Sequence, residues 1–136
     1  LIDIYKEIDC QFADMGLMWL QVELQVNSDT IDNYVLSVFN YLWRDGGKID
    51  SSKDIEQLLV SMEHIQSEVN KVSEGLSIRD AWQRYIKTRG LKHLEMSRLR
   101  AQTASISAAP TFLIGSEPFQ GRAQLPLITA RLMAGI

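Results

Sequence analysis

The residues best suited to bind a substrate lie in two short segments near the C-terminal end of the sequence. Residues 111–114, which follow Pro110, are β-branched or apolar and predict a strand, with the pair 115–116 as the turn of a hairpin. Residues 121–124 follow the second strand and begin a helix, whose free amides favour an anion. The candidate binding residues are Ala109, Pro110, Thr111, Gly121, Arg122, Ala123 and Gln124.

Side chains that do covalent or metal chemistry are few and are not grouped. Cys10, the single cysteine, excludes an internal disulfide and a Cys-x-x-Cys pair within this sequence. It lies beside the apolar stripe of a predicted helix, so we expect a buried or half-buried thiol without a catalytic role. His64 and His93 lie on different predicted helices, and we expect surface or capping histidines and no metal site. The catalytic residue is therefore unknown.

Composition indicates one globular domain. The 136 residues are 46% hydrophobic and 23% charged, and the net charge is −3. A net charge of −3 gives no reason to expect nucleic acid or an acidic membrane surface as a partner. No apolar run is long enough to span a bilayer, so we do not expect a membrane-spanning helix either. Half of the lysines and arginines fall within 79–100, which we interpret as a solvated helix face. The single cysteine and the lack of a visible signal peptide favour the cytoplasm.

The first quarter of the chain predicts a helix and an extended connector. Apolar residues recur at helical spacing over 1–15, and Gly16 is a suitable end for that helix. Residues 20–26 then alternate between apolar and polar types, which predicts an extended segment with one buried face.

Four helices are predicted next, each from apolar spacing and a polar residue at its start. Their limits are 28 or 29 to 44, 51 to 65, 77 to 90 and about 92 to 104, with a polar linker over 67–75. Ser51 and Asp54 form a predicted capping box, and Gly90 a predicted helix end. Trp19, Trp43 and Trp82 belong to apolar stripes, so we expect them in the core or lining an apolar pocket.

The C-terminal run also resembles a known family. Residues 105–112 read Ser-Ile-Ser-Ala-Ala-Pro-Thr-Phe, and residues 117–125 read Glu-Pro-Phe-Gln-Gly-Arg-Ala-Gln-Leu. This order resembles the C-terminal half of the DsbA-like thioredoxin superfamily, closest to the branch of 2-hydroxychromene-2-carboxylate isomerases and kappa-class glutathione transferases. Upstream, residues 5–16 and 42–49 resemble a helix and part of the all-helical insertion of that branch.

The resemblance implies an α/β fold of the thioredoxin-like, DsbA type with a large all-helical insertion. The residues given would then be mostly α-helical, with a C-terminal β-hairpin and helix. Residues 1–26 would be a helix and extended connector, 27–104 the helical insertion domain, and 105–136 the C-terminal half of the thioredoxin-like core. We expect the N-terminal strand–helix–strand, and the nucleophile with it, to lie outside these residues.

The function implied by the resemblance is thiol chemistry. Pro110 would follow a cis peptide bond, and the backbone beside it would bind a thiol ligand like an added strand. We expect an enzyme that forms a homodimer. The leading expectation is a thiol-dependent isomerase or transferase that uses glutathione as the thiol and acts on a small aromatic or apolar organic substrate. The alternatives are a DsbA-type thiol–disulfide oxidoreductase and a non-catalytic thioredoxin-like or helical binding module.

The sequence departs from the family pattern at the start of the last helix. The kappa-type pattern has an acidic residue and then an arginine where this chain has Ala123 and Gln124, and Arg122 stands two positions before the arginine's place. The γ-glutamyl group of glutathione would therefore be held differently or not at all. This departure favours the binding module among the alternatives.

Overall fold

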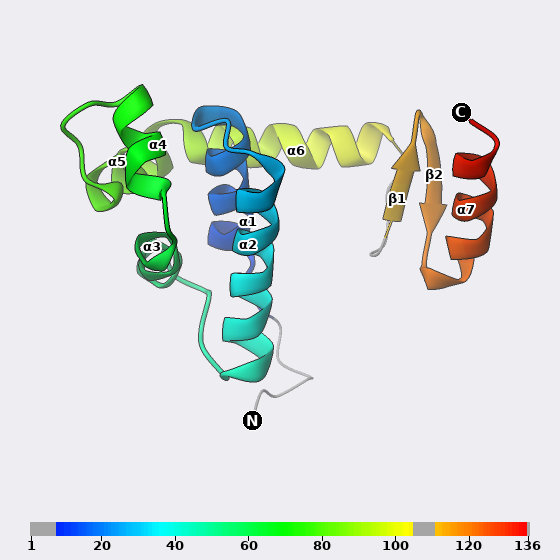
Figure 1. Cartoon of the computed structure of the whole chain (residues 1–136), viewed down its shortest axis with the longest axis horizontal. Helices are drawn as coiled ribbons and strands as arrows, with labels where there is room; N and C mark the ends of the chain where they lie inside the picture. The colour runs from blue at the N-terminus through cyan, green and yellow to red at the C-terminus, as the bar shows by residue number, and fades with distance from the viewer. Residues whose placement is uncertain (1–7, 105–110, 136) are drawn as a thin grey trace. The chain divides into compact units, whose positions relative to one another are not determined.

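A computed structural model describes residues 8–104 and 111–135 (Figure 1). Contacts between residues divide the chain into two units, Leu1–Leu94 and Glu95–Ile136. The first unit is built from helices, and the second contains the end of a long helix, a β-hairpin and a final helix. The thioredoxin-like assignment of the whole chain stays a prediction.

The first unit contains α-helices, three of which continue directly into a π-helical turn. The α-helices are α1 (Gln11–Met18), α2 (Ser28–Phe39), α3 (Ser52–Ser61), α4 (Ile65–Val72), α5 (Ile78–Tyr85) and α6 (Leu91–Thr103), of which α6 continues into the second unit. The π-helical turns are η1 (Trp19–Glu23), η2 (Asn40–Arg44) and η3 (Ile86–Gly90), which follow α1, α2 and α5.

Polar side chains cap the helices where their sequence chemistry predicts. Ser51 and Asp54 form a reciprocal capping box at the start of α3, and Ser77 caps α5. Helix α2 is capped by Asn27, whose side chain accepts a hydrogen bond of 2.9 Å from the amide of Thr30. The cap of α2 is thus one residue earlier than predicted, while the predictions for α3 and α5 are confirmed.

Aromatic side chains form the centre of the core of the first unit. The rings of Trp19 and Trp82 lie 5.7 Å apart, and those of Trp82 and Tyr85 lie 6.1 Å apart. Trp82 is fully buried, and its indole nitrogen donates to the backbone carbonyl of Ser52 at 3.0 Å. The expected core role of Trp19 and Trp82 is confirmed, whereas Trp43 is 53% exposed and does not lie in the core.

The predictions for the end of α1 and for an extended connector were wrong. Gly16 lies inside α1, where the ring of Tyr34 packs closely against it. Residues 19–23, predicted as extended, form η1. Trp19, Leu20 and Leu24 are buried while Val22 is 45% exposed, so burial follows a helical turn here and not the alternation seen in the sequence.

Two further helix limits differ from the sequence prediction. Helix α4 occupies most of the segment predicted as a polar linker, because Ile65 and Val69 lie one turn apart and are both fully buried. His64, with a left-handed φ of 68°, separates α3 from α4. Gly90 does not end a helix, since it is buried in η3 and α6 begins at the next residue.

The hairpin of the second unit lies where the sequence predicts it. Strands β1 (Thr111–Ile114) and β2 (Glu117–Gln120) pair antiparallel, with Phe112 opposite Phe119. Gly115, in the turn between them, has a φ of 62°, which a side chain would strain. The predicted hairpin and its glycine turn are confirmed.

A single helix follows the hairpin. A short 3-10 turn, η4 (Arg122–Gln124), leads into α7 (Leu125–Met133), which has Pro126 in its first turn, where a missing amide hydrogen is tolerated. An ion pair of 2.7 Å joins Arg131 of α7 to Glu117 of β2. Phe119 and Ile128 are buried between these elements.

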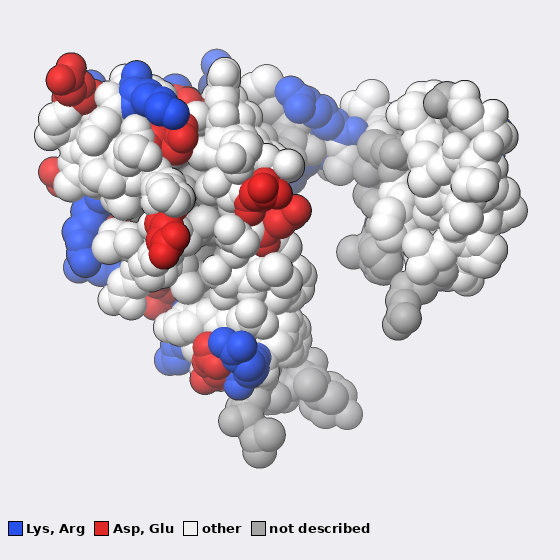
Figure 2. Space-filling model, viewed as in Figure 1, with Lys and Arg blue, Asp and Glu red and all other residues white. Residues whose placement is uncertain are grey.

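The second unit leaves much apolar surface exposed. Its large exposed apolar side chains include Leu99, Phe112, Leu125, Leu127, Leu132 and Met133. The visible face of the hairpin and α7 is almost free of charged side chains, whereas acidic and basic groups are interspersed over the first unit (Figure 2). A two-stranded hairpin is marginal by itself, so we expect further protein surface to cover this unit.

Candidate functional site

The hairpin brings the two predicted binding segments to one end. Ala109 and Pro110 lie outside the described residues, and Thr111 opens β1. Thr111 pairs with Gln120, and Gly121 follows directly, so the start of β1 and η4 are neighbours. Thr111, the described residue of the first segment, therefore lies near the second segment.

Backbone groups are the main binding capacity at this end of the hairpin. Gly121 has a left-handed φ of 84°, which redirects the chain from β2 into η4. Ala123 is exposed and uncharged, and Gln124 stands at the N-cap of α7 without a side-chain cap hydrogen bond. The amides of this turn could hold an anion, but Ala123 and Gln124 bring no charge to it.

Cys10 is placed differently from the prediction. It precedes α1 and is exposed, and its Sγ lies 3.8 Å from the carbonyl oxygen of Ile8. Partial desolvation raises the pKa of the thiol, and the carboxylates of Asp14 and Asp9 raise it further. A raised pKa favours the protonated thiol. The expected place of Cys10 inside a helix and its expected burial are wrong, and its expected lack of a catalytic role stays a prediction.

The histidines have separate structural surroundings. His93 shares a hydrogen bond of 2.9 Å between its Nδ1 and the phenol oxygen of Tyr85. His64 is exposed before α4, and its Nε2 lies 3.8 Å from a carboxylate oxygen of Glu63. Within residues 8–104 and 111–135, no three side chains of His, Cys, Asp or Glu converge as metal ligands.

Part of the basic run over 79–100 is engaged in ion pairs across the first unit. Arg79 lies 3.5 Å from the buried carboxylate of Glu56. Arg89 makes two hydrogen bonds to the carboxylate of Glu23, of which the Nη2–Oε2 bond is 3.1 Å long. These arginines therefore tie α5 and η3 to other helices of the unit, in addition to facing solvent.

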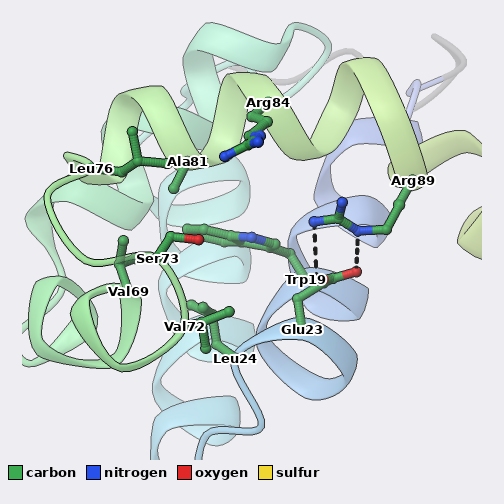
Figure 3. Close-up of a pocket in the computed structure, with 10 residues that line it drawn as sticks. All are labelled: Trp19, Glu23, Leu24, Val69, Val72, Ser73, Leu76, Ala81, Arg84 and Arg89. Atoms are coloured by element: carbon green, nitrogen blue, oxygen red, sulfur yellow. Dashed lines mark hydrogen bonds and ion pairs between the residues drawn. The ribbon is translucent and has the colours of Figure 1, made fainter.

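The first unit contains a pocket that sequence reasoning missed (Figure 3). It lies where η1, α4, α5 and η3 meet. The lining residues are Trp19, Glu23, Leu24, Val69, Val72, Ser73, Leu76, Ala81, Arg84 and Arg89. They are spread over 71 positions of the chain and match no local motif, so no signal in the sequence indicated their convergence.

The pocket has an apolar floor and a polar mouth. Trp19 is 2% exposed, whereas Arg84 and Arg89 are exposed, so we take the indole ring as the floor of the pocket and Arg84 and the Glu23–Arg89 pair as its opening. Figure 3 shows the indole ring among the other lining side chains. The enclosed space measures about 20 Å³, which is room for one water molecule or a methyl-sized group. A whole aromatic substrate does not fit within it.

Comparisons with known proteins leave the family open. No family model, no curated protein and no solved structure matches the chain. In the described part of the chain, no helix combines the length and the apolar character needed to cross a membrane.

Proposed function

We propose that the hairpin and α7 form the thiol-binding half of an enzyme of the DsbA-like type. The enzyme would use a thiol, in the first place glutathione, to isomerise a small aromatic or apolar substrate or to transfer the thiol to it. The observation that carries the proposal is the order β1, turn, β2, left-handed Gly121, η4 and α7. This is the order that the resemblance requires around its substrate-binding proline.

The proposed role of residues 109–111 and of η4 is to bind and orient the thiol. The backbone from Ala109 to Thr111 would pair with the cysteinyl part of the ligand as an added strand. The amides of η4 would receive a carboxylate of the ligand. In the isomerase reaction the thiolate sulfur adds to an electrophilic carbon of a carbon–carbon double bond, and the π electron pair moves through the conjugated carbonyl onto its oxygen. Rotation follows about the former double bond, which is now single. The electron pair then returns to form the double bond again, and the carbon–sulfur bond breaks to release the thiolate.

The exposed apolar surface of the second unit supports this proposal. Phe112 is 37% exposed and Leu127 is 55% exposed, although both lie on ordered elements. A thioredoxin-like core would cover such side chains with further strands and helices, and an apolar substrate would add to that cover. The proposed homodimer would be a further source of cover.

A binding module without catalysis is the second candidate function. Ala123 and Gln124 favour it, because neither side chain brings the charge that the resemblance expects near the γ-glutamyl group.

Matched proline variants of the natural full-length protein test the proposal. The assay follows glutathione-dependent isomerisation of 2-hydroxychromene-2-carboxylate by its ultraviolet absorbance. We expect Pro110→Ala to lower kcat/KM at least about tenfold, because that substitution alters the proposed thiol-binding backbone. Pro118→Ala, an exposed position of β2, is the control and should retain activity.

The other outcomes separate the candidates. Turnover of an insulin disulfide without glutathione would favour the thiol–disulfide oxidoreductase. Binding of glutathione without turnover of any thiol substrate would favour the binding module. Equal activity of the two proline variants would contradict the role proposed for Pro110.

A further inference from the structure

We propose that the pocket of the first unit binds a small monocarboxylate. Its carboxylate would lie between Arg84 and Ser73, and its apolar end would contact the indole ring of Trp19 (Figure 3). The pocket belongs entirely to the helical unit, so this inference does not rest on the thiol chemistry proposed for the hairpin.

Two π-helical turns contribute to the pocket, together with α4 and α5. η1 supplies Trp19 and Glu23, and η3 supplies Arg89. π-Helical residues are well under about 1% of protein structure, and single π turns occur frequently at functional sites. Two of the three π turns in the described residues therefore meet at one pocket, which is the first reason to assign it a ligand.

The wide turn of η3 also brings two arginines to the pocket. Arg84 and Arg89 are five residues apart, and in a regular α-helix such residues lie on different faces. A π turn has more residues per turn and brings positions five apart closer to one side. Both guanidinium groups stand at the mouth of the pocket (Figure 3).

The two arginines differ in their partners. Glu23, whose side chain is 17% exposed, holds Arg89 through two hydrogen bonds. Among the residues that the structure describes, the guanidinium of Arg84 and the hydroxyl of Ser73 have no hydrogen-bond or ion-pair partner. The side chains of Arg84, Arg89 and Glu23 together carry one net positive charge at the mouth of the pocket. A ligand with one negative charge would balance it.

The chemistry of the mouth favours a carboxylate. A guanidinium group donates two parallel hydrogen bonds that match the two oxygens of a carboxylate. The hydroxyl of Ser73 can donate to the same group. A dianion such as phosphate would meet the carboxylate of Glu23 at the same opening, which disfavours the second negative charge.

The apolar walls and the small volume of the pocket limit the size of the ligand beyond its carboxylate. Leu24, Val69 and Ala81 are buried and form apolar walls around Trp19. The enclosed space of about 20 Å³ admits a methyl-sized group, so the ligand must have a short apolar end. Acetate and propionate meet this condition, whereas hexanoate would leave most of its chain in solvent.

Titration of the isotope-labelled protein with sodium propionate tests the proposal. We expect saturable changes in the backbone amide signals of Ser73 and Arg84 and in the indole signal of Trp19. Sodium chloride at equal ionic strength controls for general salt effects, and propionamide is the neutral ligand of similar shape. A response to chloride or propionamide equal to that to propionate would overturn the proposal.

Paired arginine variants locate the bound carboxylate. Arg84→Gln should weaken propionate binding at least about tenfold, because a hydrogen bond to a charged group is lost. The control variant is Arg98→Gln, at an exposed position of α6 outside the pocket. It should bind propionate with the same affinity as the unchanged protein. Ser73→Ala provides a second change at the site, and the urea midpoint of each variant verifies folding. Unchanged affinity in both Arg84→Gln and Ser73→Ala would overturn the assignment.

Discussion

The phenol oxygen of Tyr34 donates a hydrogen bond of 2.6 Å to the backbone carbonyl oxygen of Ala13. The ring of Tyr34 lies against Gly16, one turn further along α1, and a methyl group of Ile55 lies beside it. Tyr34 is 2% exposed. The missing side chain of Gly16 therefore lets α2 and α3 approach α1 closely.

Replacing Gly16 with alanine should destabilise the first unit. Alanine is the better helix former by about 1 kcal/mol, so a stabilising effect would be expected in an exposed helix. At this position the added Cβ collides with Tyr34 and Ile55. We expect Gly16→Ala to lower the free energy of unfolding by about 1–3 kcal/mol, measured by urea denaturation.

A double variant tests the cause of that loss. Tyr34→Phe removes the phenol oxygen, the atom of Tyr34 nearest to the added Cβ. If the collision is the cause, the loss in Gly16→Ala/Tyr34→Phe will be smaller than the sum of the two single losses. Additive losses, or a Gly16→Ala variant at least as stable as the unchanged protein, would contradict this account.

Features set by neighbouring residues could be predicted from the sequence. The capping box of Ser51 and Asp54 depends on a spacing of three residues, and the hairpin depends on extended runs around Gly115. The start and end of α6 were also close to their predicted limits. Each of these signals is local, so no knowledge of the tertiary packing was needed.

Features set by tertiary packing could not be predicted in this way. Gly16 has the sequence signature of a helix end, but its role depends on Tyr34, which lies on another helix. The alternation over 20–26 has the period of a strand, but Leu20 and Leu24, four residues apart, are both buried in the helical core, which favours a helical turn. The pocket depends on two such turns, so it was missed as well.

The buried tyrosines should make stability fall at alkaline pH. Burial raises the pKa of Tyr34, and the nearby carboxylate of Asp14 adds to this. Burial also raises the pKa of Tyr85, with Glu23 raising it further and Arg89 opposing that effect. In the unfolded chain both phenols would titrate near the ordinary value of about 10.

The sign of the effect follows from these two shifts. A folded-state pKa above the unfolded value means that the unfolded chain loses its protons first as the pH rises. The contribution of the two buried phenols to the free energy of unfolding is fully present below a pH of about 10. It decreases as the pH rises from there toward the folded-state pKa. Urea midpoints measured across this range should fall, and the fall should be smaller in Tyr34→Phe. A pH-independent midpoint would contradict the prediction.

Loss of the side-chain cap at the start of α3 should lower the free energy of unfolding modestly. The hydroxyl of Ser51 accepts a hydrogen bond of 3.2 Å from the amide of Asp54 and donates one of 2.7 Å to its carboxylate. We expect Ser51→Ala to lower the free energy of unfolding by about 1 kcal/mol. Ser52→Ala is the matched control, because Ser52 contributes its backbone carbonyl to Trp82 and keeps it in the variant. Equal losses in the two variants would argue against the cap as the cause.

The carboxylate of Glu56 should be the most sensitive polar group of the core. Its side chain is 8% exposed, and its Oε1 accepts a hydrogen bond of 3.1 Å from Nε2 of Gln83. Gln83→Leu leaves this buried oxygen without that donor, so we expect a loss of about 1–3 kcal/mol in the free energy of unfolding. Arg79 remains at 3.5 Å from the other oxygen but is 60% exposed, so water screens its charge.

Removing both partners separates the unmet hydrogen bond from a loss of packing. In Glu56→Leu/Gln83→Leu no buried oxygen remains to be satisfied, and apolar side chains of similar size fill the space. We therefore expect the double variant to be more stable than Gln83→Leu alone, as measured by urea denaturation. A double variant that loses as much as the two single changes together would show that the Glu56–Gln83 pair contributes through packing and not through its hydrogen bond.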